Sequence, residues 1–225
     1  MNYAYSYEWD VRYCYENSYV LRNKLGLTDS DKLHEAERRL AGLKISVAKV
    51  APIRGNLDFK HLSAIHKYIF GEIFEWAGEL RTVNISKGNP FCNYNVLHMY
   101  GADLFGKLHA ERYLLDTLQK HITERLAHYL SEINVMHPFR EGNGRSQRLF
   151  IEYLALIAGY RVDFTDVTST EIIEASVRAF SRDESHLRCI FDRITTPVSL
   201  EEQQSAIRAI CGTRSKILRI FKENL

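Results

Sequence analysis

Apolar side chains recur every three or four residues through most of the chain, which is the spacing of one buried face of an α-helix. The pattern is strongest at residues 33–46, 59–78, 121–136 and 146–158. Asp29 or Ser30 is suited to cap the first of these helices. Less marked helical patterns occur at about 169–180 and 183–194, from Leu97 to Gln119, and from Pro197 to the end. The sequence therefore predicts an all-α fold.

One segment departs from the helical pattern. Residues 80–96 hold the β-branched Thr82, Val83 and Ile85, followed by the turn-forming Lys-Gly-Asn-Pro at 87–90. This order is typical of a short β-hairpin. We therefore expect a helical bundle with one short hairpin as its only strand structure.

Composition excludes several classes of protein. A chain of 225 residues, of which 45% are hydrophobic, can bury a core without disulfides or a structural metal. The four cysteines form no CxxC pair, so neither a disulfide framework nor a zinc ribbon is expected. Thirty basic residues against 28 acidic ones leave almost no net charge, which argues against nucleic-acid binding. The basic residues near the C-terminus are interpreted as a solvated helical face. No membrane span or secretory signal is recognised, so we expect a cytoplasmic protein.

Tyrosine is concentrated at the N-terminus, where five of the first 15 residues are tyrosines. Tyr3, Tyr5 and Tyr7 alternate with other residues, which is the spacing of an extended segment with one aromatic face. We interpret this part of the chain as an arm on the surface of the domain.

The segment with the most chemical content runs from His137 to Arg148, with the sequence HPFREGNGRSQR, between two predicted helices. Its Gly-Asn-Gly at 142–144 allows a tight turn at a helix start, where backbone N–H groups and the helix dipole favour an anion. Arg145 and Arg148 share the first turn, where positive charge opposes the dipole unless a polyanion such as a triphosphate neutralises it. Glu141 is suited to hold Mg²⁺, and His137 to accept a proton at neutral pH. Together these residues describe a site for phosphoryl or nucleotidyl transfer.

Other phosphate and metal motifs are absent from the sequence. It contains no GxxxxGK[ST] loop, no GxGxxG after a strand and no HExxH. A glycine-rich loop before a helix is also often a plain connection, and a lone histidine beside a proline is more often structural than catalytic. From the residues alone, a phosphate site and a structural loop both stay open.

Residues 137–148 resemble, position for position, the HPFx[D/E]GNGRxxR signature of the Fic family (filamentation induced by cAMP). Three other segments are similar to parts of the same family: LRNKLGL at 21–27, IFEWAGELRTVNISKG at 73–88 and INVMHPF at 133–139. The resemblance implies a Fic-type helical bundle in which the hairpin is the flap. It divides the chain into an N-terminal arm at 1–20, a Fic domain at 21–195 and a C-terminal helical extension at 196–225.

The resemblance also implies an activity. Members are protein adenylyltransferases, which transfer AMP from Mg·ATP to a Tyr, Thr or Ser hydroxyl of a target protein. By this resemblance His137 is the general base, Phe139 is a core plug that holds the loop, and Glu141 binds Mg²⁺. The flap at Lys87 and Gly88 pairs with the target as an added strand. The remaining motif residues bind the triphosphate: Gly142, Asn143 and Gly144 at the α-phosphate, and Arg145 and Arg148 at the β- and γ-phosphates.

Two details of the sequence refine this expectation. Gly144 stands where a phosphate-transferring branch of the family has lysine, which favours AMP transfer. Many members also carry an inhibitory helix with the pattern [S/T]xxxE[G/N]. The Glu-Asn pairs of this chain, at 16–17 and 223–224, have arginine four residues before the glutamate and do not fit. We therefore expect a toxin held off by a separate small helical antitoxin, whose glutamate contacts Arg148.

Two alternatives stay open at this point. One is a translocated effector that modifies host GTPases, a kind of protein that usually carries a secretion or extra binding domain. The other is a non-enzymatic nucleotide-binding interaction module, in which the motif histidine, glutamate or arginines are expected to be damaged, whereas all are intact here. No permanent cofactor is predicted beyond the Mg²⁺ that accompanies ATP.

Overall fold

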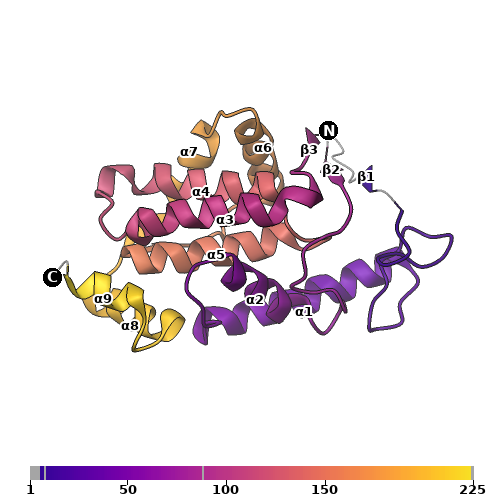
Figure 1. The fold of residues 1–225 in the computed structure, drawn as a ribbon, viewed down its shortest axis with the longest axis horizontal. Coiled ribbons are helices and arrows are strands. Elements are labelled where there is room, and N and C mark those ends of the chain that lie inside the picture. Colours follow the sequence, from indigo (N-terminus) through magenta and orange to yellow (C-terminus); the bar gives the residue numbers. More distant parts are fainter. Residues whose placement is uncertain (1–5, 8, 88, 224–225) are drawn as a thin grey trace.

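Helices make up most of the fold (Figure 1). The computed structural model describes residues 6–7, 9–87 and 89–223. The α-helices of this part, in chain order, are α1 (Ser30–Val50), α2 (Phe59–Phe70), α3 (Leu97–Ala110), α4 (Ile122–Met136), α5 (Asn143–Ala158), α6 (Ser169–Phe180), α7 (Ser185–Ile194), α8 (Leu200–Cys211) and α9 (Lys216–Glu223). Short 3₁₀ turns lie at Tyr94–Val96, Arg112–Leu114 and Gln119–His121. The predicted helical architecture is confirmed.

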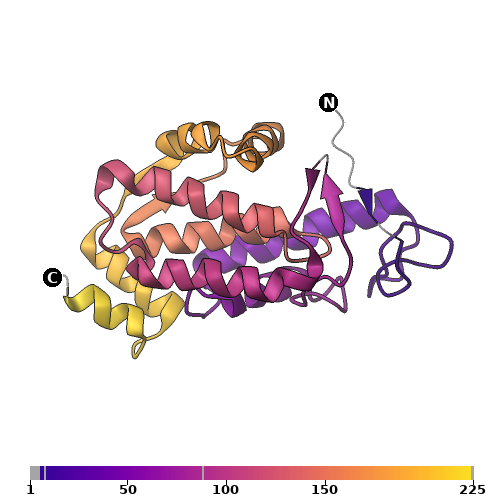
Figure 2. The same cartoon turned by 45° about the horizontal axis from the view of Figure 1, so that its top comes forward.

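Helix α5 lies at the centre of the bundle and is buried over most of its length. Helix α4 packs along it, and α2 and α8 pack against other parts of its surface (Figures 1 and 2). Tyr153 ties α5 to the N-terminal part of the chain, because its hydroxyl donates to the Ala48 carbonyl and accepts the Ile53 N–H. The loop between α4 and α5 is therefore attached at its C-terminal end to a helix that is buried over most of its length.

Two small antiparallel sheets accompany the helices. In the first, β2 (Ile85–Lys87) pairs with β3 (Asn89–Pro90) as the predicted hairpin, and it also pairs with β1 (Ser6–Tyr7) on its other side. In the second, β4 (Tyr160–Val162) pairs with β5 (Thr195–Pro197). The second sheet was not expected, because three-residue strands are too short to show an alternating pattern. It ties the chain after α7 back to the end of α5.

Helix α2 is shorter than predicted. It ends at Phe70, where Gly71 caps it, and does not continue to Gly78. The apolar residues that follow, such as Phe74 and Trp76, are buried within an irregular segment that is rich in turns. Aromatic residues at helical spacing fill the core here without forming a helix, a difference that periodicity does not reveal.

Two other predicted helices are interrupted. The segment expected to run from Leu97 to Gln119 is helix α3 only as far as Ala110, after which the backbone passes through Tyr113 in a left-handed conformation. The C-terminal segment is two helices, α8 and α9, separated at Gly212, whose φ of 87° suits glycine. Each interruption includes a residue with positive φ, which a regular helix does not accommodate.

The N-terminal arm is anchored in the domain. Tyr13 is buried, and its hydroxyl accepts the Thr82 N–H at 3.1 Å. Cys14 is fully buried as well. The expected surface position is therefore wrong at Tyr13 and Cys14, while Tyr3 and Tyr5 lie outside the described residues.

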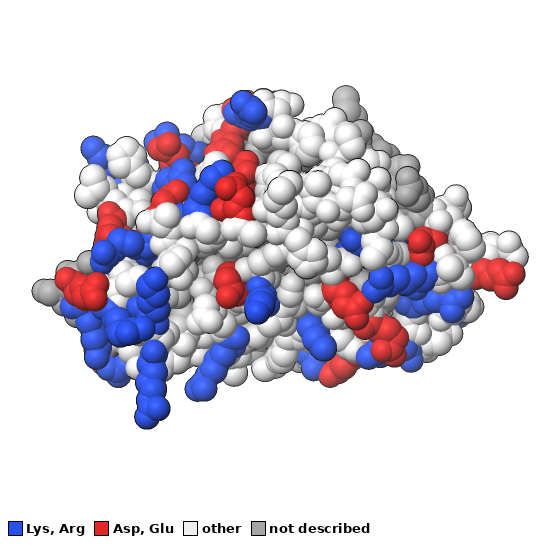
Figure 3. Space-filling model, viewed as in Figure 1, with Lys and Arg blue, Asp and Glu red and all other residues white. Residues whose placement is uncertain are grey.

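Basic side chains gather at the C-terminal end of the molecule, over α8 and α9 (Figure 3). They include the exposed Arg208, Arg214, Lys216, Arg219 and Lys222. This is the arrangement expected of a solvated helical face. Within the described ranges, no helix is both long and apolar enough to cross a bilayer.

Candidate active site

The motif loop joins the C-terminus of α4 to the N-terminus of α5. His137 ends α4 in a left-handed conformation with φ 43° and ψ 62°, and Gly142 precedes α5 with φ 79°. A Cβ atom on Gly142 would lie 2.4 Å from the Phe70 ring, so both the conformation and the available space require glycine. The tight loop places His137 and the first turn of α5 around the same cavity.

Two buried polar side chains hold the loop in shape. Asn143 accepts the Phe139 N–H at 2.8 Å and donates to the Phe139 carbonyl at 2.7 Å. The Phe139 ring is fully buried and stacks on His66 with centroids 3.9 Å apart, which confirms the expected core plug. His66 accepts the Gly78 N–H at Nδ1 and therefore donates from Nε2 to the Glu141 carbonyl. The sequence carried no signal for this role of His66, which lies in α2 and binds the backbone of the loop at Glu141.

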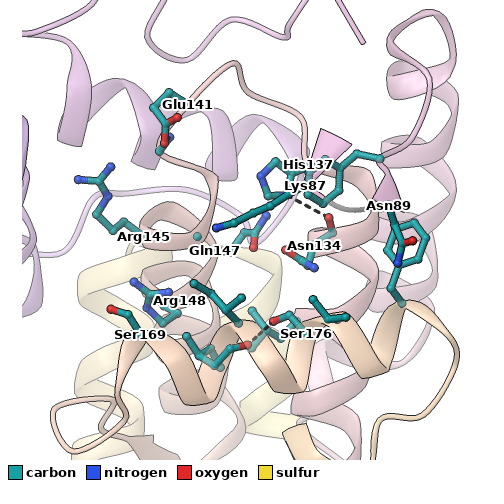
Figure 4. Close-up of a pocket in the computed structure, with 18 residues that line it drawn as sticks. Lys87, Asn89, Asn134, His137, Glu141, Arg145, Gln147, Arg148, Ser169 and Ser176 are labelled. Carbon is teal, nitrogen blue, oxygen red and sulfur yellow. Dashed lines mark hydrogen bonds between the residues drawn. The ribbon is translucent and has the colours of Figure 1, made fainter. Parts of the chain in front are cut away.

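His137 is buried, and its proton can be placed. Its Nδ1 lies 3.1 Å from the Asn134 carbonyl, which can only accept, so Nδ1 carries the proton and Nε2 carries the lone pair (Figure 4). The ring stacks on Phe91 with centroids 3.7 Å apart. Burial, together with the charges of Arg81 and Lys87, lowers the pKa of His137 to about 3. The imidazole is therefore neutral at physiological pH, which is the state that a general base requires.

The buried side chain of Arg81 connects the flap to the motif loop through hydrogen bonds. No feature of the sequence indicated this role. Its side chain donates from Nε to the His137 carbonyl at 2.9 Å and from Nη1 to the Val83 carbonyl at 2.7 Å. Nη2 donates to the Cys92 carbonyl on the far side of the hairpin. The Arg81 backbone N–H donates to the Pro138 carbonyl at 2.9 Å. Arg81 thus fixes the backbone at His137 relative to both sides of the flap.

Replacing Arg81 with methionine is expected to lower the free energy of unfolding by about 3 kcal/mol or more. Methionine has a similar length, but it leaves the carbonyl groups that Arg81 binds without their buried donors. The matched control is Arg12→Met, because Arg12 is exposed and pairs with Glu79 at the surface, where the cost should stay below about 1 kcal/mol. Urea denaturation measures both values, and equal losses would contradict the role assigned to Arg81.

The cavity at the motif loop has a volume of about 280 Å³ (Figure 4). Its charged and glycine-lined end is formed by Glu141, Gly142, Gly144, Arg145 and Arg148. Apolar side chains of α6 and α4 line another wall: Leu130, Ile172, Ile173, Val177 and Phe180. The flap contributes Lys87, Asn89 and Phe91. The cavity therefore offers a polar, positively charged end and an apolar wall beside His137.

Arg145 has a buried carboxylate partner that sequence reasoning missed. Glu37 of α1 is 4% exposed and lies 2.5 Å from the Arg145 guanidinium, which also sits over the Phe70 ring. Burial raises the pKa of Glu37, while the charge of Arg145 lowers it. The ion pair orients Arg145 at the wall of the cavity.

Arg148 has no such partner among the described residues. It is partly buried, and within the described ranges it forms neither a hydrogen bond nor an ion pair. Burial lowers the pKa of Arg148, Arg145 lowers it further, and Glu152 raises it. Gly144 lies beside it, since a Cβ atom there would be 3.3 Å from Nη1 of Arg148. A partly buried guanidinium that lines a cavity and forms no ion pair with the described residues is suited to bind an anion.

Glu141 is the one carboxylate among the described residues that line the cavity. Its Oε1 accepts the Gly142 N–H at 2.9 Å. Magnesium in nucleotide sites is typically held by one or two carboxylates together with phosphate oxygens and waters. The donor set therefore fits Mg²⁺ that arrives with a nucleotide. Burial lowers the pKa of Lys87 and the charge of Glu141 raises it, so the flap lysine lies within electrostatic reach of this carboxylate.

Most residues predicted for the site line this one cavity: Lys87, His137, Glu141, Gly142, Gly144, Arg145 and Arg148. Asn143 does not, because both ends of its side-chain amide bind the Phe139 backbone. Its side chain holds the loop, and the expected contact with the α-phosphate stays a prediction. Gly88 lies outside the described residues.

The buried histidines predict a loss of stability in mild acid. Burial lowers the pKa of both His66 and His137 to about 3, whereas an unfolded histidine titrates near 6.5. Below pH 6.5 the unfolded state therefore binds protons that the folded state does not, so stability is full at neutral pH and is lost as the pH falls. Between about pH 7 and 5.5 the free energy of unfolding should fall by about 2 to 3 kcal/mol.

Urea denaturation at the two pH values measures this loss. The variant His66→Gln should show a smaller pH dependence than the wild type but keep part of it, because His137 and the buried His61, whose pKa burial also lowers, still contribute. The exposed His98 of α3 provides the control, because His98→Gln should leave the dependence unchanged. A wild-type stability that does not change over this range would contradict the buried, neutral state of the two histidines.

Comparison with known proteins agrees with the geometry. Residues 56–155 match a family model described as the Fic/DOC family. The "Probable protein adenylyltransferase Fic" of Salmonella typhimurium is 37% identical over 182 residues, which cover 80% of this chain and 90% of that protein.

Solved structures resemble the fold over a similar length. The N-terminal Fic domain of a VirB-translocated Bep effector protein from Bartonella quintana, with bound ADP, has a TM-score of 0.79 and 29% identity and covers 84% of this chain and 96% of that one. BepC from Bartonella tribocorum, with bound AMPPNP, has a TM-score of 0.78 and 28% identity and covers 84% of this chain and 98% of that one. The motif, the helical architecture and these relatives agree that the chain belongs to the Fic/DOC family.

Proposed function

We propose that this protein is an adenylyltransferase that transfers AMP from ATP to a hydroxyl group of a target protein. The observation that carries the proposal is that one cavity holds a neutral histidine, His137, beside Arg148 and the first turn of α5. A proton acceptor and an anion site in one cavity suit the attack of a hydroxyl on a phosphate. The name of the Salmonella relative and the nucleotides bound in the Bartonella structures support the same activity.

The nucleotide is proposed to lie along the cavity with its phosphates at the charged end. Residues 143–145 form the first turn of α5, where backbone N–H groups and the helix dipole favour the α-phosphate. Arg145 and Arg148 are placed for the β- and γ-phosphates. The adenine would lie against the apolar wall formed by α6. This wall supplies base-binding residues that the sequence alone did not indicate.

In the proposed reaction the hydroxyl oxygen of the target attacks the α-phosphorus, and pyrophosphate leaves with the electrons of the broken P–O bond. Nε2 of His137 accepts the hydroxyl proton. Its Nδ1 proton stays bound to the Asn134 carbonyl, which holds the ring in orientation. The N–H groups of the first turn of α5 stabilise charge that develops on the α-phosphate. Mg²⁺ held by Glu141 would neutralise part of the phosphate charge when bound.

Gly144 supports transfer of AMP rather than of phosphate. The absence of a side chain at this position leaves room next to the Nη1 atom of Arg148. The phosphate-transferring branch of the family has lysine at this position. A lysine side chain here would enter the space beside Arg148 and add a second positive charge.

Partners and regulation follow from the same site. We propose that the target docks on the flap near Lys87 as an added strand, and that a separate antitoxin places a glutamate against Arg148. The internal candidate Glu223 instead lies 4.0 Å from Arg112. The free thiols at Cys14, Cys92, Cys189 and Cys211 support a reducing, cytoplasmic setting.

The test compares ATP labelled at the α-phosphate with ATP labelled at the γ-phosphate, each incubated with the protein, Mg²⁺ and a bacterial lysate. The α-label should become bound to protein, and the γ-label should leave in pyrophosphate. Protein-bound γ-label would assign phosphate transfer instead. No bound label from either nucleotide, when ATP still raises the melting temperature, would contradict the proposed transfer.

A further inference from the structure

The outer edge of the flap strand β2 is covered by the N-terminal part of the same chain. Ser6 of β1 pairs with Ser86, and Tyr7 pairs with Ile85, in antiparallel register (Figure 1). Because β3 pairs with the other side, β2 is the middle strand of three. A peptide that added to the outer edge of β2 would need the backbone groups that β1 now uses.

The other edge of the flap is a poor docking strand. β3 consists of Asn89 and Pro90, both exposed. Because proline has no backbone N–H, a strand added to β3 would find one donor at most. In the described part of the flap, the outer edge of β2 is therefore the better template for an extended peptide. Its last residue, Lys87, lines the cavity, so this edge leads to the site.

The segment that follows β1 has anchors of its own. The described part of β1 is Ser6–Tyr7. The following segment is fixed by the buried Tyr13, whose hydroxyl accepts the Thr82 N–H, and by the fully buried Cys14. Because these anchors do not involve β1, the rest of the arm can stay in place when β1 separates from β2.

We propose that β1 is an internal competitor for the edge on which the target docks, and that an extended segment of the target protein displaces it. This inference rests on the proposed function, because it assigns a partner to the flap of the same site. The two described residues of β1 contribute about two backbone hydrogen bonds, whose net strength favours the covered edge roughly tenfold. A longer segment of a target can pair with more of β2 and therefore replace β1.

Two full-length variants test the proposal. One holds β1 on the outer edge of β2, and the other weakens the pairing of β1 with β2. Ser6→Cys combined with Ser86→Cys places cysteines on paired positions, where a disulfide can hold β1 on β2. Ser6→Pro combined with Tyr7→Pro removes both N–H donors of β1. The single variants Ser6→Cys and Ser86→Cys control for reactions of the native thiols. The readout is protein-bound label from α-labelled ATP in a bacterial lysate, and the rise in melting temperature with ATP reports on the cavity.

The oxidised double-cysteine variant should lose labelling by at least roughly tenfold and regain it on reduction, with its response to ATP unchanged. The double-proline variant should label targets about threefold more than the wild type, or better. Equal labelling by the oxidised, reduced and wild-type proteins would overturn the inference and leave AMP transfer standing. If no form labels any protein, wild type included, although ATP binds, the proposed function itself is contradicted.

Discussion

The His137→Ala variant is expected to transfer AMP about a thousandfold more slowly than the wild type while it binds ATP with similar affinity. The expectation follows from the placement of the proton. Nδ1 donates to the Asn134 carbonyl, so Nε2 is the nitrogen that can accept the proton of the attacking hydroxyl. Alanine removes this acceptor and leaves Arg145, Arg148 and the first turn of α5 in place.

Transfer of label from α-labelled ATP measures the rate of AMP transfer, and calorimetric titration measures the affinity for ATP. His98→Ala, on the exposed face of α3, is the matched control and should keep wild-type activity. Because the pKa of His137 is lowered to about 3, kcat/KM of the wild type should not fall as the pH drops from about 7 to 6. A His137→Ala variant with more than about a tenth of the wild-type rate would remove His137 from the role of general base.

Arg148→Met is expected to weaken ATP binding by about 10- to 100-fold, which corresponds to about 1.5 to 3 kcal/mol for a charged hydrogen-bonding group. Without nucleotide, the same variant should be as stable as the wild type or more so. The reason is that burial removes part of the water around the Arg148 charge, while no ion pair among the described residues offsets that cost, so methionine removes it. Stability and binding should thus change in opposite directions.

Thermal unfolding with and without ATP shows both effects in one experiment. The wild type should gain stability with ATP by mass action, and Arg148→Met should lose most of that gain. Arg188→Met is the control, because Arg188 lies on the exposed surface of α7 near Asp192. An Arg148→Met protein that is destabilised without nucleotide, and that responds to ATP like the wild type, would show that Arg148 serves the fold instead.

The part of the site that is continuous in sequence could be predicted from it. His137, Glu141 and the arginines of the motif loop are close in the chain, and one loop between two amphipathic helices brings them to one cavity. The hairpin was predictable for a similar reason, because its turn and β-branched residues are local signals. Periodicity alone set the C-terminal limit of α2 wrongly, since Phe74 and Trp76 fill the core from an irregular segment after the helix.

The supports of the loop could not be predicted, because each acts across a long stretch of chain. Arg81, Glu37 and His66 contact the motif from the flap, α1 and α2. Each is a single polar residue within an otherwise ordinary segment, and its burial depends on the packing of other elements. The pairing of β1 with β2 is equally remote, since it joins residues about eighty positions apart.

Peptide mass spectrometry of lysate proteins incubated with Mg·ATP and either the wild type or His137→Ala tests the proposed AMP transfer most directly. We expect the mass of one AMP on a Tyr, Thr or Ser side chain of a target, present with the wild type and lost with the variant. Added phosphate in place of AMP, or the same AMP adduct with both proteins, would contradict it.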